Sequence, residues 1–188
     1  MNNKNNIKNN NTKIKNDKIL FIIGLPGCGK TSLSKMLAKK LNYDFYDMDL
    51  IIEEKEKMKI SEIFAKYGEK YFREKESELL EKLSELKDAV ISTGGGIVVA
   101  EKNRSVMKKK GITIFINRKP NIILKNIDVV ERPLLAKDKN KLIELYKERE
   151  PLYQETADII FNHDTWEENI EETFNIFYDY IKKRNILI

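Results

Sequence analysis

The sequence of 188 residues predicts an α/β fold, a three-layer α/β/α sandwich around a central parallel sheet. Two observations predict it. Short apolar runs recur along the chain, and stretches of helical periodicity separate them, the order typical of βαβ units. The first run, ILFII, leads directly into GLPGCGKTS and then an amphipathic stretch. A strand, a glycine-rich loop and a helix in that order form a phosphate-binding unit.

Composition limits the other possibilities. The chain is 41% hydrophobic, and no run approaches the roughly 20 apolar residues of a membrane helix. A single cysteine excludes an internal disulfide framework. Of the net charge of +5, four Lys and one Asp in residues 1–17 supply +3. The charge is therefore too scattered to favour a nucleic acid, and we expect neither a nucleic-acid nor a membrane partner.

Residues 1–17 are Asn/Lys-rich and have almost nothing to bury, so we expect a disordered tail there and one domain over 18–188. The start of the chain also has an alternative interpretation as an export signal, because a Lys-bearing leader precedes an apolar run with a small-residue end. The run is short for that purpose, and SLSKMLAKKL follows it at helical spacing. These features favour the phosphate loop.

The loop itself fits the Walker A pattern, Gly24-x-x-x-x-Gly29-Lys30-Thr31. Backbone N–H groups turn toward phosphate oxygens, and the start of the helix adds a partial positive charge. Lys30 is expected to reach the outer phosphates, and the Thr31 hydroxyl can ligate Mg²⁺. The residues expected to bind the nucleotide are Gly27, Cys28, Gly29, Lys30, Thr31 and Ser32. Cys28 is interpreted as a small loop residue.

The predicted strands cover residues 19–24, 45–48, 89–92, 112–117 and 157–161. Ligands of such folds bind at the carboxyl ends of the strands. The second strand closes with Asp47, Met48 and Asp49. On extended chain the two carboxylates point to opposite faces, so one can order Mg²⁺ and the other can align an acceptor hydroxyl. The alternative is a solvated acidic turn.

Residues 71–86 predict one amphipathic helix in which a carboxylate, Glu76, falls inside the apolar stripe. Such a carboxylate is costly unless it is paired, and Arg73 lies three residues earlier, at ion-pair spacing. We infer that Glu76 holds the Arg73 guanidinium in a fixed direction, which suits recognition of a planar carboxylate. A purely structural pair remains the alternative.

The third predicted strand runs into Gly94, Gly95 and Gly96, which permit a close backbone approach to a ligand or form only a tight turn. Two arginines follow. Arg132 lies in the connection DVVERPLLAKD, and Arg149 lies in KEREPLY, at the end of a helix predicted near 139–150. Pro151 restricts the residue before it, which favours a helix end there.

Together, GLPGCGKTS, DMD, FREKE, GGG, RPLL and REPLY occur in an order and spacing that resemble the shikimate kinase family over about residues 18–183. The resemblance implies a P-loop NTPase fold of the nucleoside-monophosphate-kinase type, usually in a monomeric cytoplasmic enzyme. It implies ATP-dependent phosphorylation of the 3-hydroxyl of shikimate, giving shikimate 3-phosphate and ADP. The pathway would be chorismate and aromatic amino-acid biosynthesis.

On the nucleotide side, the resemblance makes Thr31 a magnesium ligand and Asp47 an indirect magnesium partner. It places Arg132 on a lid near 126–138, where it would contact the ATP phosphates and act with Lys30 in catalysis. Two positions depart from the family: Lys125 stands where many members have a second arginine, and Trp166 replaces a proline. Thr165 to Glu168 has the form of a capping box, so the last helix is expected to start at Thr165.

On the acceptor side, the resemblance makes Asp49 the catalytic contact to the substrate hydroxyls. Arg73 and Arg149 would bind the shikimate carboxylate, and Gly95 would contact the substrate through its backbone. Two alternatives stay open. One is a kinase for another hydroxylated acceptor, such as gluconate or a nucleoside monophosphate. The other is a nucleotide-binding module without catalysis.

Overall fold

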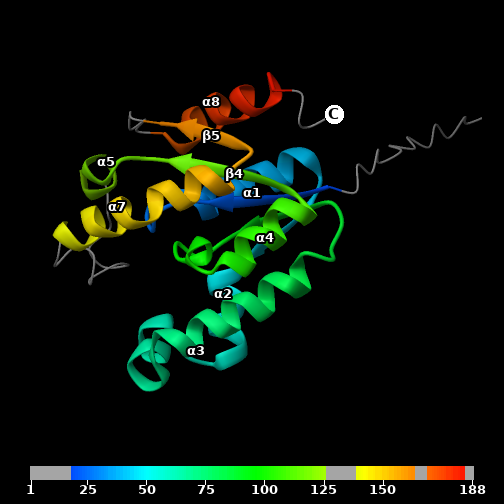
Figure 1. The fold of residues 1–188 in the computed structure, drawn as a ribbon. Helices are drawn as coiled ribbons and strands as arrows, with labels where there is room; N and C mark the ends of the chain where they lie inside the picture. The colour runs from blue at the N-terminus through cyan, green and yellow to red at the C-terminus, as the bar shows by residue number, and fades with distance from the viewer. Residues whose placement is uncertain (1–17, 126–138, 164–168, 185–188) are drawn as a thin grey trace, which may run out of the picture.

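The computed structural model describes residues 18–125, 139–163 and 169–184. Five parallel strands form one sheet in the order β2-β3-β1-β4-β5 (Figure 1). The strands are β1 (Ile19–Ile23), β2 (Asp44–Asp47), β3 (Ala89–Ser92), β4 (Ile112–Asn117) and β5 (Ile159–Asn162). The predicted parallel sheet is confirmed, with shifts of one or two residues at the ends of three strands.

Helices cover both faces of the sheet (Figure 1). Helices α1 (Lys30–Leu41) and α8 (Ile170–Lys182) lie on one face, and α4 (Glu101–Lys110) and α7 (Lys139–Thr156) lie on the other. Helices α2 (Met48–Glu56) and α3 (Ile60–Leu83) pack together beside the β2–β3 side. Two short elements, η1 (Ile97–Val99) and α5 (Pro120–Lys125), follow β3 and β4. The predicted three layers are confirmed.

The centre of the core is β1, whose five residues are all buried. A parallel strand covered on both faces reads as continuous apolar sequence, which explains why ILFII shows no alternation. Each fully buried Ile, Leu or Phe side chain contributes about 1.5–3 kcal/mol to the stability of the fold.

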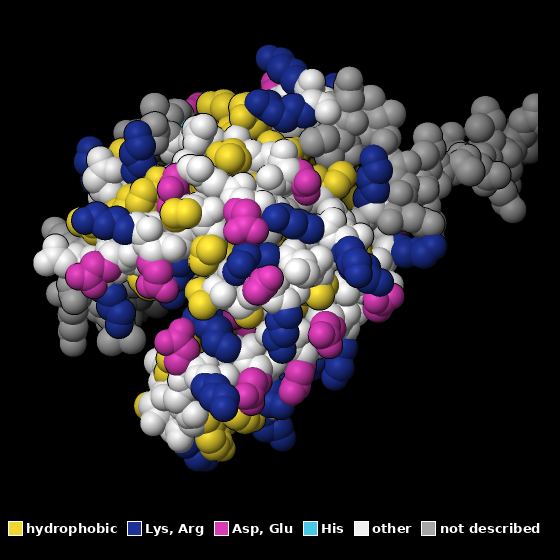
Figure 2. All heavy atoms as spheres, in the orientation of Figure 1, with side chains coloured by type: hydrophobic (Ala, Val, Ile, Leu, Met, Phe, Trp, Pro, Cys, Tyr) yellow, Lys and Arg dark blue, Asp and Glu magenta, His cyan; other side chains and the backbone are white. Residues whose placement is uncertain are grey.

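The surface of the molecule is charged. On the face shown in Figure 2, Lys and Arg are interspersed with Asp and Glu. None of the described helices is both long and apolar enough to cross a bilayer.

Two expectations about helix boundaries near the site were wrong. The second strand does not continue to Asp49, because the Asp47 side chain accepts hydrogen bonds from the backbone N–H groups of Asp49 and Leu50 and caps α2. Helix α7 does not end before Pro151 but continues to Thr156. The buried Tyr153 lies in this continuation, so tertiary packing offsets the backbone hydrogen bond that a proline removes.

Two other helices differ from the prediction. Helix α3 is kinked at Gly68, where φ is 80°, and the helix predicted over 71–86 is the part after this kink, which ends at Leu83. Helix α8 begins at Ile170 rather than Thr165, and the Asn169 side chain caps it by accepting the N–H of Glu171. The tail (1–17), the expected lid (126–138) with Arg132, and the segment with Trp166 (164–168) lie outside the described residues.

Candidate active site

The phosphate loop joins β1 to α1 at the carboxyl edge of the sheet. Gly29 caps α1 with φ at 96°, a left-handed conformation that strains any residue with a side chain. The ammonium of Lys30 donates to the carbonyl oxygens of Gly24 and Leu25, both across 2.9 Å. Cys28 is buried, and its N–H donates to the carbonyl of Leu25 at 3.2 Å. The loop therefore holds its own lysine close.

Thr31 and Asp47 meet directly beside this loop. The Thr31 hydroxyl donates to Oδ2 of Asp47 across 2.7 Å, while Oδ1 of Asp47 caps α2. A hydroxyl and a carboxylate are hard oxygen donors of the kind that Mg²⁺ prefers. No group of three or more His, Cys, Asp or Glu side chains in the described part of the chain could hold a metal ion alone. The pair thus fits an ion that takes its other ligands from phosphate and water.

Across the sheet edge, α3 presents the predicted Arg73–Glu76 pair. Nη1 of Arg73 lies 2.7 Å from Oε2 of Glu76, and Glu76 is fully buried. Glu69 accepts from Nε and Nη2 of the same guanidinium at 3.2 and 3.0 Å. Burial raises the pKa of the Glu76 carboxyl to about 7, although Arg73 opposes the rise. The guanidinium is therefore clamped between two carboxylates.

The three glycines after β3, called here the glycine loop (residues 94–96), bring these groups together. A β carbon on Gly94 would lie 2.8 Å from Oδ1 of Asp49 and would overlap Oε1 of Glu76. A β carbon on Gly96 would overlap the guanidinium of Arg73. Side chains from α2 and α3 thus converge on backbone that only glycine leaves accessible. The glycine loop is more than a tight turn.

Helix α7 supplies the second cation. Arg149 is buried, and its Nη1 donates to the carbonyl oxygen of Gly95 at 3.2 Å. The hydroxyl of Tyr153, one turn further along α7, donates to the same oxygen. Arg73 and Arg149, far apart in sequence, therefore both contact the glycine loop. The binding of one carboxylate by both arginines stays a prediction.

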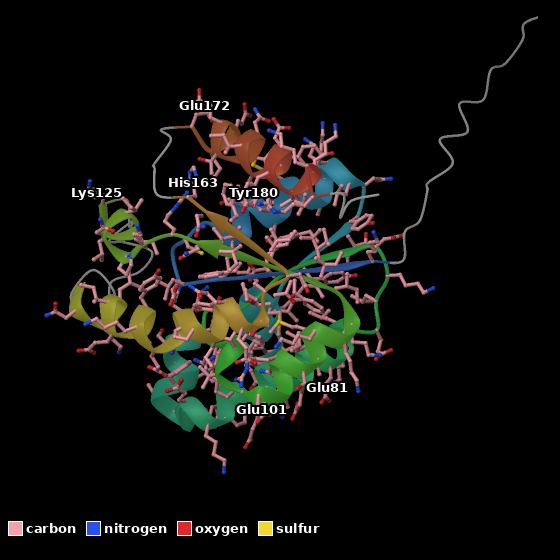
Figure 3. The ribbon with its side chains drawn as sticks, turned by 45° about the horizontal axis from the view of Figure 1, so that its top comes forward. Glu81, Glu101, Lys125, His163, Glu172 and Tyr180 are labelled. Atoms are coloured by element: carbon pink, nitrogen blue, oxygen red, sulfur yellow. The ribbon has the colours of Figure 1, made fainter. Side chains whose placement is uncertain are left out.

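Reasoning from the sequence alone did not identify two residues that lie near the site. Arg118 directly follows β4, is 4% exposed, and places Nη1 3.8 Å from where a β carbon on Gly29 would lie. Burial lowers the pKa of its guanidinium, and the Cys28 thiol opposes that. Because NRKP follows a predicted strand, the strand-end rule that singled out Asp47 also applies to Arg118. Tyr153 carried no such signal. Lys125 is exposed at the end of α5 (Figure 3).

The sheet order, the Walker loop between β1 and α1, and the separate α2–α3 unit define a P-loop kinase fold of the nucleoside-monophosphate-kinase type. The family model for shikimate kinase matches residues 26–181. The chain belongs to the shikimate kinase family.

Similar proteins and solved structures support the same family membership. A shikimate kinase of Alkaliphilus oremlandii is 46% identical over 162 residues, covering 82% of this chain and 96% of the relative. One of Clostridium botulinum is 43% identical over 154 residues, covering 81% and 93%. The structure of shikimate kinase from Acinetobacter baumannii in complex with shikimate superposes with a TM-score of 0.81 at 29% identity, covering 90% of this chain and 96% of that one. The enzyme from Bacteroides thetaiotaomicron gives 0.80 at 33% identity, covering 88% and 98%.

Proposed function

We propose that this protein transfers the γ-phosphoryl group of ATP to the 3-hydroxyl of shikimate, giving shikimate 3-phosphate and ADP. The observation that carries the proposal is the convergence of Arg73 and Arg149 on the glycine loop beside Asp49. Two guanidinium groups suit an acceptor with a carboxylate, and a nearby carboxylate suits one with hydroxyls. The family membership supports the same acceptor, in the biosynthesis of chorismate and aromatic amino acids.

The nucleotide side supplies charge stabilisation. In phosphoryl transfer, charge spreads over the equatorial oxygens of the moving group, so fixed cations provide most of the catalysis. Lys30 would leave its loop carbonyls to contact the phosphates, with Gly27, Cys28, Gly29 and Ser32 lining the loop and Arg132 adding a second cation. When bound, Mg²⁺ would neutralise phosphate charge. Thr31 would hold it, and Asp47 would orient it.

The residues on the acceptor side would position the acceptor for phosphoryl transfer. Arg73 and Arg149 would bind the carboxylate, the backbone at Gly95 would contact the ring substituents, and Asp49 would accept a hydrogen bond from the attacking hydroxyl. As the new O–P bond forms and the bond to ADP breaks, Asp49 takes the hydroxyl proton. Holding both reactants in line removes most of the entropic cost of bringing them together.

The proposal extends to a monomeric cytoplasmic enzyme with ATP and shikimate as its small-molecule partners, and with neither nucleic acid nor membrane as a partner. The chain's single cysteine accords with a reducing compartment.

A coupled assay of ADP release tests the proposal. The full-length protein is given ATP and Mg²⁺ with shikimate, gluconate, a nucleoside monophosphate or no acceptor. We expect ADP release to depend on shikimate. Turnover with gluconate or a nucleoside monophosphate, and none with shikimate, would show that shikimate is not the acceptor. Bound ATP without turnover of any acceptor would instead support a nucleotide-binding module without catalysis.

A further inference from the structure

Tyr153 is buried beneath the glycine loop. Its side chain has no exposed surface, and its ring stacks on Phe115 with centroids 4.9 Å apart and an interplanar angle of 28°. Its hydroxyl donates to the carbonyl oxygen of Gly95. Arg149, four residues earlier on α7, donates to the same oxygen from Nη1 at 3.2 Å. One backbone oxygen is therefore held by two side chains from one helix.

The other carbonyl groups of the glycine loop are also engaged. The carbonyl of Gly94 accepts the N–H of Ile97 at 3.2 Å, and that of Gly96 accepts the N–H of Val99 at 3.0 Å. The N–H groups of the three glycines donate to no acceptor among the residues that the structure describes. The loop thus turns its acceptors into the protein and leaves its donors for a ligand.

Tyr153 influences one of these N–H donors through the planar peptide group that it contacts. The peptide group between Gly95 and Gly96 is planar and trans, so its N–H points opposite to its C=O. Because the C=O is held toward α7, the N–H of Gly96 points away from Tyr153. A β carbon on Gly96 would overlap the guanidinium of Arg73, so this amide lies beside that group. Rotation of this one peptide would turn the Gly96 donor to another direction.

We infer that Tyr153 is a positioning residue for the acceptor's carboxylate. It holds the Gly95 carbonyl, and through it the direction of the Gly96 amide and the resting place of the Arg149 guanidinium. The inference rests on the proposed function for the identity of the acceptor. Burial raises the pKa of the Tyr153 phenol, so the group keeps its proton and remains a donor over the working pH range.

Tyr153→Phe removes only the hydroxyl and keeps the ring that stacks on Phe115. We expect the KM for shikimate to rise about three- to tenfold, the loss of one neutral hydrogen bond. The kcat and the KM for ATP should stay within about twofold of wild type. Tyr180→Phe is the matched control, because the Tyr180 hydroxyl donates to the Ile160 carbonyl at 2.6 Å on the other side of the sheet (Figure 3). It should change none of these parameters.

An acceptor without the carboxylate separates positioning from a merely structural role. In a shikimate analogue whose carboxylate is replaced by hydroxymethyl, Tyr153→Phe should raise the KM by less than about twofold, because the oriented donors have no anion to bind. An equal increase in KM for shikimate and for the analogue would overturn the inference. So would an unchanged KM for shikimate in Tyr153→Phe.

NMR can observe the glycine loop directly. Among the eight glycines of the chain, only Gly95 and Gly96 follow another glycine. Protein labelled with ¹³C-carbonyl and ¹⁵N glycine therefore gives two signals in an HNCO experiment, one from each amide. We expect Tyr153→Phe to move both signals in the free protein and to reduce their response to shikimate, and Tyr180→Phe to leave both unchanged.

The two proposals fail in different ways. A wild-type protein that does not phosphorylate shikimate would refute the proposed function. Wild-type turnover of shikimate, with Tyr153→Phe matching wild type in KM and in both glycine signals, would refute only the positioning role. Melting curves of each variant show whether a change in KM accompanies a loss of folded protein.

Discussion

The carboxylate of Glu76 lies 2.7 Å from the guanidinium of Arg73, one turn apart on α3, in a place where Glu76 has no exposed surface. A buried carboxylate is costly, and the pairing returns only part of that cost. The ion pair instead fixes the orientation of the Arg73 guanidinium, which is held against Gly96, where it can bind an anion. Glu76 is therefore a residue whose removal tests both stability and substrate binding.

Glu76→Gln should change how stability depends on pH. Burial raises the folded-state pKa of Glu76 to about 7 from an ordinary 4.5. A folded pKa above the unfolded one stabilises the protein fully below about pH 4.5, and this contribution is lost as pH rises through about 7. Between about pH 5 and pH 8, the free energy of unfolding of wild type should thus fall by up to about 3 kcal/mol relative to that of Glu76→Gln.

Melting curves of both proteins across this range measure the difference. Glu78→Gln is the control, because Glu78 is an exposed carboxylate on the same helix. Parallel curves for wild type and Glu76→Gln would show that Glu76 ionises normally.

Arg73→Ala should lower kcat/KM for shikimate by about 2–4 kcal/mol, roughly 30- to 1000-fold, because a charged contact to the acceptor is removed. The KM for ATP should barely change. Arg73→Lys keeps the charge but not the planar fork, so it should recover only part of the loss. Lys75→Ala, which removes a partly exposed cation two residues away, is the control. Intact turnover of shikimate by Arg73→Ala would mean that the acceptor binds elsewhere.

Asp49→Asn and Lys30→Ala should separate the two halves of the site. Asp49→Asn keeps the size of the side chain but removes its charge, so kcat should fall by about 10²–10⁴-fold while ATP still binds. Lys30→Ala should instead weaken ATP binding, because the lysine is the cation of the phosphate loop. Calorimetric titration with ATP measures both affinities. Similar losses of ATP affinity in both variants would contradict this division of roles.

Thr31→Val and Asp47→Asn should both raise the Mg²⁺ concentration needed for half-maximal activity, because each removes an oxygen donor or charge from the Thr31–Asp47 pair. Asp47→Asn keeps a side chain able to cap α2, whereas Asp47→Ala should also cost about 1 kcal/mol of stability. Activity measured across a Mg²⁺ series, with a melting curve for each variant, distinguishes the two effects. An unchanged Mg²⁺ dependence in Thr31→Val would exclude Thr31 as a ligand.

Local patterns in the sequence determined the phosphate loop, the strands and the Arg73–Glu76 pair. Each depends on neighbours within a few residues: the Walker spacing, an apolar run of strand length, and the three-residue spacing that brings two side chains to one helix face. The pair was recognisable because a carboxylate inside an apolar stripe needs a partner. These features could be predicted because the chain itself holds the interacting groups close together.

Only the tertiary structure decided how the helices end and what meets at the glycine loop. Local signals favoured an extended Asp49 and a helix stopping before Pro151, but the Asp47 cap and the packing of Tyr153 outweighed them. Asp49 and Arg73 on one side and Arg149 on the other reach the glycine loop from separate helices. Contacts between residues far apart along the chain depend on how whole elements pack, and no spacing in the sequence records that packing.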